Sequence, residues 1–312
     1  MTNRKYVYGY DFGTLSCRLI IVNIATGEIV AQGVEEYPNG VISEQLPNSD
    51  VILPPEWYLQ DLDDYIIVLS SLSKRLLKET GISPKDVIGI GSCFTNCTMM
   101  PMDIDGTVLC QKKEYRNDPH AWVKLWKHHG AQPYAEEIEA YAKENVDWLG
   151  EYGNNVSSEW FFPKVLQIYR ESPEIYKRAD VFIEAADWIV YKMTGNLIRN
   201  SATLGVNSFW NPKRGYPSKE FFYNIEPGLE NVIEEKMKGE IAVVGTNAGN
   251  LTPEFAELLG LTTDTVVSVG HGDSEVAACG TSSVDSGTMI IVMGTSTCHQ
   301  MIHNTIRDID GI

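Results

Sequence analysis

The stretch that decides the fold is Tyr8-Gly9-Tyr10-Asp11-Phe12-Gly13-Thr14-Leu15-Ser16-Cys17-Arg18. A β-rich run enters it at Tyr6, and a second run, residues 19–22, leaves it. A tight turn at Gly13 therefore joins two predicted strands. The chain turns again at Ala25-Thr26-Gly27 and returns through residues 29–31. The pattern predicts a meander of strands at the start of a sheet.

The turn between the first two strands carries groups that bind phosphate. Gly13 lets backbone N–H groups approach an anion, and the hydroxyls of Thr14 and Ser16 donate hydrogen bonds. Arg18 adds a planar guanidinium group for phosphate oxygens. Asp11 would be misplaced beside bare phosphate, so we expect a metal ion between the two. The alternative is an ordinary hairpin with a glycine turn.

The composition restricts the kinds of partner. The chain has 312 residues, of which 43% are hydrophobic and 21% charged, as is ordinary for a globular protein with a sizeable core. Its net charge of −17 argues against nucleic acid or an anionic membrane as the main partner. A small anionic ligand such as a nucleotide remains compatible, because it needs only a few local donors and a metal. The sequence leaves open whether the chain forms a homo-oligomer.

The termini and the cysteines bear on the compartment. No signal sequence precedes Tyr6 and no apolar run reaches about 18 residues, so we expect a cytoplasmic protein. The six cysteines show no CxxC pair and no disulfide framework, which favours reduced thiols. Cys93 and Cys97 could be combined with His128 and His129 into a zinc site, but their spacing matches no usual ligand pattern.

The rest of the chain alternates strand and helix patterns. Residues 61–79 carry apolar side chains at i, i+3, i+4 spacing, which predicts an amphipathic helix ended by Gly81. Residues 200–219 are aromatic and polar with no clear period, consistent with a loop or a segment that faces substrate. Further predicted strands are 87–91, 241–244, 265–269 and 287–293, and further predicted helices are 118–129, 134–145, 163–171, 174–178, 186–194 and 252–260.

Two later stretches carry chemistry. The run 266–269 is a buried strand pattern, and it leads through Gly270-His271-Gly272 to Asp273 at a predicted helix start. An ionised aspartate at the edge of a cleft is what a transferred hydroxyl needs as general base, although Asp273 could also simply cap the helix. A further strand ends in Gly294-Thr295-Ser296-Thr297, which repeats the glycine and hydroxyls of the first turn. Together these features argue for nucleotide phosphate held between two lobes, with an acid facing the acceptor.

The sequence resembles the FGGY family of carbohydrate kinases, and within it the ribulokinase branch. The similarity runs through nearly the whole chain, and its motifs occur in the family's order. They are Asp11-Phe12-Gly13-Thr14 with Arg18, Trp57-Tyr58-Leu59-Gln60-Asp61, Phe94-Thr95-Asn96-Cys97-Thr98, Lys124-Leu125-Trp126-Lys127-His128-His129, Ser157-Ser158-Glu159-Trp160-Phe161-Phe162-Pro163-Lys164, Asp187-Trp188, Gly272-Asp273 and Met293-Gly294-Thr295-Ser296-Thr297-Cys298-His299.

This resemblance implies an actin-like, ribonuclease-H-like α/β fold, in which two lobes with a mixed sheet flanked by helices hold ATP and Mg²⁺ in a cleft. It implies that Asp11 orients magnesium and that Asp273 is the catalytic base for a terminal hydroxyl of a ketopentose, in arabinose or other pentose catabolism. The implied phosphate contacts are Gly13, Thr14, Ser16 and Arg18 from one lobe and Gly294, Thr295 and Ser296 from the other. The implied sugar contacts are Thr95, Asn96, Asn207 and Asp273.

The sequence departs from the ribulokinase pattern at several positions. Cys93 stands where these enzymes usually carry an Asp, Asn96 replaces a small residue, and Asn207 stands where we expect a lysine. The run 270–275 also differs from the usual Gly-Asn-Val-Asp-Ala-His. These changes put the identity of the sugar in doubt more than the type of reaction.

The length is a further departure, because family members are much longer, as two lobes of this kind require. We expect residues 1–283 to form the N-terminal, sugar-binding domain and residues 284–312 to begin the C-terminal, nucleotide-binding domain, the rest of the second lobe being truncated. Three functions stay open at this point. They are a ribulokinase-type pentulose kinase, a kinase for another sugar or polyol of the same family, and a non-catalytic sugar-binding or interaction protein.

Overall fold

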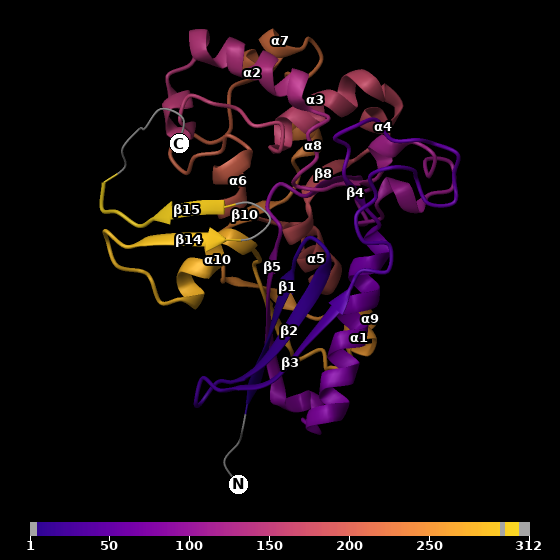
Figure 1. Cartoon of the computed structure of the whole chain (residues 1–312), viewed down its shortest axis with the longest axis vertical. Coiled ribbons are helices and arrows are strands. Elements are labelled where there is room, and N and C mark those ends of the chain that lie inside the picture. The colour runs from indigo at the N-terminus through magenta and orange to yellow at the C-terminus, as the bar shows by residue number, and fades with distance from the viewer. Residues whose placement is uncertain (1–4, 294–296, 306–312) are drawn as a thin grey trace.

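The computed structural model describes residues 5–293 and 297–305. Its largest sheet contains seven strands, in the order β11-β12-β5-β1-β2-β3 with β13 pairing with β5 (Figure 1). The strands are β1 Tyr6–Phe12, β2 Ser16–Asn23, β3 Ile29–Glu36, β5 Val87–Phe94, β11 Asn247–Asn250, β12 Val266–Ser268 and β13 His271–Gly272. The pairs β1–β2, β2–β3 and β11–β12 are antiparallel, whereas β5 runs parallel to β1, β12 and β13. The sheet is therefore mixed, as the resemblance implied.

The predicted opening meander is confirmed, and its alternation of buried and half-exposed residues shows how it faces the core. Along β1 the side chains of Tyr6, Tyr8, Tyr10 and Phe12 are buried, while those between them are partly exposed. Because successive side chains of a strand point to opposite faces, Asp11 points to the face opposite Tyr10 and Phe12.

Helix α1, Leu62–Thr80, covers the buried face of β1. Asp61 caps its N-terminus by accepting from the N–H of Asp63, and Gly81 ends it in the left-handed conformation at φ 65°. Phe12 stacks on Phe94 of β5 at a centroid distance of 4.8 Å, and Tyr65 of α1 lies edge-on to both rings. This aromatic cluster holds the ends of β1 and β5 together, one residue beyond Asp11 and Cys93.

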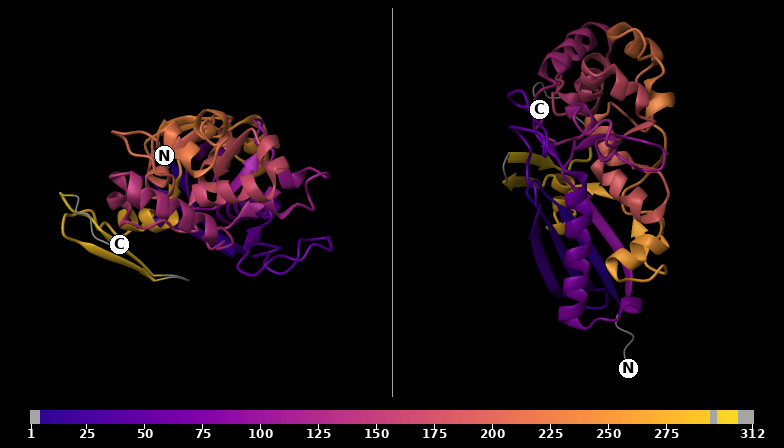
Figure 2. Two further views of the ribbon diagram at one scale, coloured as in Figure 1. Left: turned by 90° about the horizontal axis from the view of Figure 1, so that it is seen from above. Right: turned by 90° about the vertical axis from the view of Figure 1, so that its right-hand side faces the viewer.

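A second region lies above the main sheet in Figure 1, and Figure 2 shows it as a separate layer of helices at one end of the molecule. It contains a four-stranded antiparallel sheet in the order β4-β7-β6-β8. Its strands are β4 Leu59–Gln60, β6 Met99–Met102, β7 Val123–Lys124 and β8 Val181–Glu184.

The remaining elements of the described chain are the helices, one further strand pair and four short 3-10 helices. The helices are α2 Gln132–Asn145, α3 Phe161–Glu171, α4 Pro173–Arg178, α5 Ala185–Thr194, α6 Ser201–Asn207, α7 Lys219–Ile225, α8 Val232–Lys236, α9 Pro253–Leu259 and α10 Asp273–Gly280. The strand pair is parallel and consists of β9 Ile198–Asn200 and β10 Glu240–Ala242, and the 3-10 helices are Pro84–Asp86, Leu109–Gln111, Pro119–Ala121 and Trp148–Tyr152.

Two sequence predictions in this region are corrected. The predicted helix at residues 118–129 is wrong, because only Pro119–Ala121 form a helical turn and Val123–Lys124 form strand β7. Residues 120–125 are buried without interruption, so the stretch has no solvent face for an amphipathic helix. Residues 201–207, which showed no clear period, form helix α6. Its N-cap, Asn200, is held in place by two hydrogen bonds to Asp187, a contact that the local sequence does not reveal.

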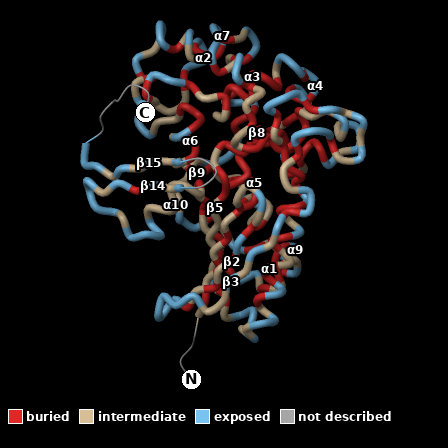
Figure 3. The backbone as a smooth tube through the Cα atoms, viewed as in Figure 1, coloured by how far each residue is buried: buried red, intermediate tan, exposed pale blue. Residues whose placement is uncertain are grey.

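The C-terminal part of the described chain is an antiparallel hairpin of β14, Met289–Met293, and β15, Thr297–Met301. It lies beside α10 at the margin of the molecule (Figures 1 and 2), and Figure 3 shows it mostly exposed or intermediate. Met289, Ile291 and Met293 are 55%, 51% and 83% exposed. The main core, by contrast, is buried between α1, the sheet and α5.

All six cysteines lie within the described ranges and all are free, which agrees with the predicted absence of a disulfide framework. Among the described residues, no His, Cys, Asp and Glu side chains converge in a group of three or more that could hold a metal ion. His128 instead bonds to Gln167, so the zinc alternative has no geometric support. None of the helices in the described ranges has the length and apolar character needed to cross a bilayer.

Candidate active site

Three neighbouring strands bring the predicted acids to one edge of the main sheet. In the register of β1 and β5, Asp11 lies opposite Cys93, and in that of β5 and β13, Cys93 lies opposite His271. Asp273 follows β13 directly and is the first residue of α10. Because β1, β5 and β13 run parallel, their carboxyl ends meet at the same edge. Asp11 and Asp273, far apart in sequence, are therefore brought together by the sheet.

The turn after β1 is held by contacts of its own. The N–H of Gly13 donates to the carbonyl of Ser16 at 3.0 Å, so it is used inside the turn in this conformation. A Cβ atom at Gly13 would lie 3.3 Å from the Ser16 carbonyl oxygen and 3.4 Å from Nη1 of Arg18. A side chain at Gly13 would therefore crowd the turn, and the N–H of Gly13 itself is not available to an anion in this conformation.

The polar side chains of this turn lie near the surface. Arg18 pairs with Asp11, Nη1 to Oδ2 at 3.0 Å, and both side chains are half-exposed. The hydroxyl of Thr14 accepts a hydrogen bond from Nε1 of Trp126 at 3.0 Å, and the Thr14 carbonyl accepts one from Gln60 at 2.8 Å. Ser16 is partly exposed at the start of β2. The turn thus presents a cation and two hydroxyls at the sheet edge, and Trp126 fixes it to the second region.

Asp273 lies in a partly desolvated position. Burial raises the pKa of its carboxyl to about 6, and the nearby carboxylates of Asp11 and Glu275 act in the same direction. The backbone N–H groups of Ser274 and Asn96 oppose the shift, Ser274 donating to Oδ1 at 2.8 Å. A carboxylate with a pKa near 6 is mostly ionised at neutral pH yet more basic than a free aspartate, as a general base requires.

The loop after β5 carries two of the predicted sugar contacts. The side chain of Asn96 reaches α10, where its Nδ2 atom lies 2.9 and 2.7 Å from the two carboxylate oxygens of Glu275. Thr95 is buried, and its hydroxyl shares a 2.7 Å hydrogen bond with that of Thr98. Asn96 therefore lies directly beside Asp273, whereas Thr95 contributes to the support of the loop.

Asn207 lies at the end of α6 and is completely buried. Its Nδ2 atom donates to Oε1 of Glu184 at 2.7 Å and to the sulfur of Cys97 at 3.4 Å. The structure thus places Asn207 behind the loop that carries Asn96, where it contacts protein groups.

Sequence reasoning missed two buried ionisable side chains, Lys164 and Glu184, under this loop. Lys164 of α3 donates to the carbonyls of Cys97 and Leu125 at 2.7 and 2.9 Å, and Glu184 lies beside it. Burial lowers the pKa of Lys164 to about 8 and raises that of Glu184 to about 8. The only signal in the sequence was that Lys164 ends one of the family motifs. Through these hydrogen bonds, Lys164 holds the loops that carry Asn96 and Trp126 against α3.

Gly294, Thr295 and Ser296, the predicted phosphate contacts of the other lobe, lie outside the described residues. Their flanking strands, β14 and β15, contact α10, the helix that begins with Asp273.

Asp11 and its surroundings fit a magnesium ion. Asp11 is partly exposed and lies close enough to Asp273 to raise the pKa of that carboxyl, and its Oδ2 atom, now paired with Arg18, would exchange this partner for the ion. Magnesium is usually bound through one or two carboxylates while water and phosphate supply its other ligands. A site with few protein carboxylates at an open edge matches this mode of binding, and Asp11 is the residue that would hold the ion.

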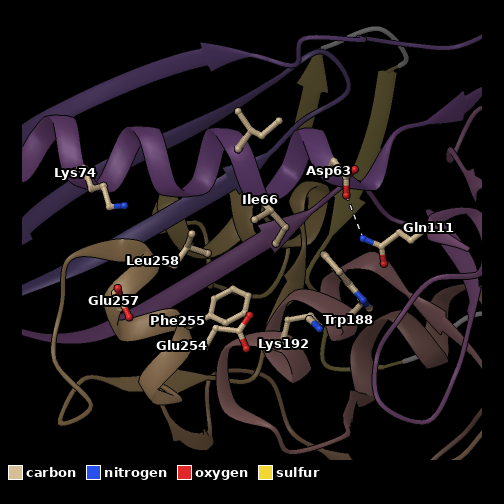
Figure 4. A pocket seen from close by; sticks show the side chains of 11 residues that line it. Asp63, Ile66, Lys74, Gln111, Trp188, Lys192, Glu254, Phe255, Glu257 and Leu258 are labelled. Carbon is tan, nitrogen blue, oxygen red and sulfur yellow. Dashed lines mark hydrogen bonds between the residues drawn. The ribbon is translucent and has the colours of Figure 1, made fainter. Parts of the chain in front are cut away.

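A pocket of about 710 Å³ lies elsewhere, between α1, α5 and α9 (Figure 4). Ile66, Trp188 and Phe255 line it together with charged residues such as Lys192 and Glu254. Since α1 covers the face of β1 opposite Asp11, this pocket does not belong to the site at the sheet edge.

The comparison of sequences identifies the family to which this fold belongs. Residues 6–280 match the model of the FGGY family of carbohydrate kinases, N-terminal domain. The chain belongs to the FGGY family of carbohydrate kinases.

The individual relatives are more specific. The ribulokinase of Geobacillus thermodenitrificans is 46% identical over 310 residues, and that of Halalkalibacterium halodurans is 41% identical over 309 residues. Each alignment covers 99% of this chain and 55% of the relative, so the chain spans about half the length of the curated relatives it matches.

Solved structures confirm the fold. A xyloylose kinase from Brucella ovis superposes with a TM-score of 0.73 at 21% identity, over 94% of this chain and 54% of that one. The xylulose kinase of Rhodospirillum rubrum gives a TM-score of 0.73 at 18% identity, over 97% of this chain and 56% of that one. The predicted α/β, actin-like fold with a mixed sheet and flanking helices is therefore confirmed.

Proposed function

We propose that this chain is part of an ATP-dependent kinase that phosphorylates a terminal hydroxyl of a ketopentose of the ribulose type, in arabinose or other pentose catabolism. The relatives named ribulokinase support the choice of sugar, and the position of Asp273 beside Asp11 at the carboxyl ends of β13 and β1 supports the reaction. We place the protein in the cytoplasm, because ATP and the intermediates of sugar breakdown are found there.

Asp273 acts as the general base in this proposal. Its carboxylate accepts the proton of the terminal sugar hydroxyl, whose oxygen forms a bond to the γ-phosphorus while the bond from that phosphorus to the bridging oxygen of ADP breaks. The proton leaves late in a loose transition state, so alignment of the hydroxyl contributes more than its full deprotonation. Asn96 bonds to Glu275 and so holds the start of α10, where Asp273 lies. Thr95 supports the loop that carries Asn96.

Asp11 would hold Mg²⁺, which when bound neutralises charge on the phosphate oxygens. Arg18, Thr14 and Ser16 lie on the turn next to Asp11 and are proposed as phosphate contacts, with Gly13 shaping that turn. We assign Gly294, Thr295 and Ser296 the same role from the opposite side of the cleft, on their sequence pattern alone.

We also propose that residues 1–283 form the sugar-binding domain and that residues 284–312 begin the nucleotide-binding domain. The family match over residues 6–280 is consistent with this boundary. Asn207 is proposed to act on the sugar site indirectly, through Glu184 and the loop of Cys97, because its amide is buried.

The test is a sugar panel with ATP, run on the complete gene product and on the 312-residue chain. We expect the complete protein to phosphorylate L-ribulose, and the chain by itself to bind L-ribulose weakly with negligible turnover, because transfer requires both lobes to close on the nucleotide. Rapid phosphorylation of L-ribulose by the isolated chain would contradict this division of labour. A second candidate is a kinase for another sugar or polyol, in which Asn96 and Asn207 reshape the sugar site, and the same panel would identify it.

A further inference from the structure

Asn96 and Glu275 are joined directly beside Asp273. The Nδ2 atom of Asn96 lies 2.9 and 2.7 Å from the two carboxylate oxygens of Glu275 and 3.2 Å from the hydroxyl of Ser274. Glu275 stands in the first turn of α10, two residues after Asp273. The loop after β5 and the start of α10 are thus connected through side chains at the point where the proposed base emerges.

Gly272 makes this contact possible. A Cβ atom at this position would lie 2.0 Å from Oδ1 of Asn96 and 2.3 Å from Oε2 of Glu275, so a larger residue would force these two side chains to move. The backbone of Gly272, at φ −71° and ψ 147°, is open to every residue, so the glycine serves this contact through the space it leaves and not through its conformation. Asn96, Gly272 and Glu275 are therefore mutually dependent.

The contact leaves an acceptor unused. Oδ1 of Asn96 is buried and has no hydrogen-bond partner within the described part of the chain, because the amide nitrogen is directed to Glu275. Buried polar atoms are rarely left unpaired, so Oδ1 would gain a partner if the Asn96 side chain turned toward a hydroxyl of a bound sugar. Neutral sugars carry such donors.

The charges around the contact are mostly negative. Glu275, Asp273 and Asp11 lie close enough to one another to affect the Asp273 carboxyl, and Arg18 is paired with Asp11. A substrate that carries a carboxylate of its own would meet repulsion here, whereas a neutral ketose would donate hydroxyls to the same oxygens.

We propose that the Asn96–Glu275 pair is a specificity-determining element of the sugar site, which admits neutral polyhydroxy sugars and excludes sugar acids. This inference rests on the proposed function, since it assigns a selectivity to the sugar site that Asp273 serves. It adds Glu275 and Gly272 to the residues that shape this site.

The structural half of the proposal is tested by thermal unfolding of the 312-residue chain. Gly272→Ala should lower the Tm by about 5 °C, because its methyl group collides with Asn96 and Glu275. Asn96→Ala introduced into that variant should recover most of the loss, which makes the two substitutions strongly non-additive. Gly280→Ala is the matched control in the same helix, since a Cβ atom there would meet nothing within 4 Å, and it should leave the Tm unchanged or higher. Additive losses would overturn the coupling.

The functional half is tested by calorimetry with L-ribulose and L-arabinonate, a neutral ketose and a five-carbon sugar acid. The unmodified chain should bind L-ribulose more tightly, and Glu275→Gln should shift the ratio of the two affinities by about tenfold toward the acid, since it keeps the shape and removes the charge. Glu254→Gln, an exposed change on the remote helix α9, should leave the ratio unaltered.

The results distinguish a failure of the specificity role from a failure of the proposed function. If the unmodified chain binds L-ribulose but Glu275→Gln leaves the ratio within about twofold, the specificity role is overturned and the proposed function stands. If the complete gene product neither binds nor phosphorylates any sugar, the proposed function fails, and the specificity role fails with it.

Discussion

The thiol of Cys93 donates to the carboxylate of Asp11, with 3.5 Å between Sγ and Oδ1. The two residues face each other in the register of β5 and β1, and burial together with the Asp11 charge raises the pKa of the thiol far above its usual range. Cys93 is therefore a neutral donor at neutral pH. A carboxylate in its place would add a charge to a site that already contains Asp11 and Asp273.

Cys93→Asp should make stability depend on magnesium. Two carboxylates facing each other across neighbouring strands repel, and the cost should be about 1–2 kcal/mol in the presence of EDTA. Magnesium at millimolar concentration should restore much of it, because the added acid supplies a further ligand. The measurement is the Tm with and without Mg²⁺, with Cys93→Ser as the uncharged control. Equal magnesium effects on both variants would show that Asp11 does not lie at a cation site.

Asp273→Asn should lower turnover by about 10²–10⁴-fold in the form of the protein that phosphorylates sugar, since it removes the base but keeps the shape. The unmodified enzyme should gain rate as pH rises through about 6, where Asp273 loses its proton. Initial rates from about pH 5 to about pH 8 measure both effects. A variant with near-normal turnover would remove Asp273 from the mechanism.

Asp273 should also reduce stability at neutral pH. Burial raises its folded-state pKa to about 6, above the value of about 3.9 in an unfolded chain, so the folded state binds more protons between these values. Its contribution to the free energy of unfolding then falls as pH rises from about 4 to about 6. Asp273→Asn should be more stable than the unmodified chain by about 1–3 kcal/mol at about pH 7 and equal to it near about pH 3.5. Urea unfolding at the two pH values tests the sign, and a variant less stable at neutral pH would contradict it.

Asp11→Ala should weaken the use of Mg·ATP and leave sugar affinity nearly unchanged. Asp11 pairs with Arg18 of the turn after β1, whereas Asp273 lies at the start of α10 and Asn96 bonds to the same helix. Steady-state kinetics with varied Mg·ATP and calorimetry with L-ribulose separate the two. Lost sugar affinity with intact nucleotide kinetics would reverse the assignment.

The two buried lysines should respond in opposite directions to the same substitution. Lys164→Met removes three hydrogen bonds from a buried ammonium group to main-chain carbonyls and leaves those acceptors unpaired, so we expect a loss of about 3–5 kcal/mol. The Nζ atom of Lys124 has no hydrogen-bond partner in the described residues and lies 4.1 Å from the centroid of the Trp57 ring. Lys124→Met should leave the free energy of unfolding at neutral pH unchanged or raise it by up to about 2 kcal/mol.

The sign for Lys124 follows from its titration. Burial lowers its pKa to about 7, below the unfolded value of about 10.4, so the unfolded chain binds more protons between these values. The stability of the unmodified chain should therefore rise with pH over this window, and Lys124→Met should flatten the rise. Denaturant unfolding from about pH 7 to about pH 9.5 measures the slopes, and equal slopes in the two proteins would contradict the assignment.

Much of the fold could be read from local patterns. The strands around Gly13, the helix that ends at Gly81, the helix between Thr252 and Gly260 and the helix start at Asp273 are all confirmed. Each depends on signals that act within a few residues, namely alternation, capping groups and glycine at a chain reversal. The errors occurred where local signals were absent. Residues 120–125 form buried chain on both sides of a short strand, and the N-cap of α6, Asn200, is held by Asp187 from another helix.

The candidate site divides in the same way. From the sequence alone, Asp11, Arg18 and Asp273 are predicted to be chemically important, because an acid or a cation next to a glycine turn is informative without a partner. Only the tertiary structure showed that Gly13 uses its N–H inside the turn, that Asn207 is buried against Glu184, and that Lys164 supports the sugar loop. Only the structure, too, joined Asn96 to Glu275 over the space left by Gly272. The physical reason is the distance along the chain over which each kind of signal acts. Turn and helix signals arise between neighbours in sequence, whereas packing space, desolvation and charge pairing depend on residues that only the folded sheet brings together.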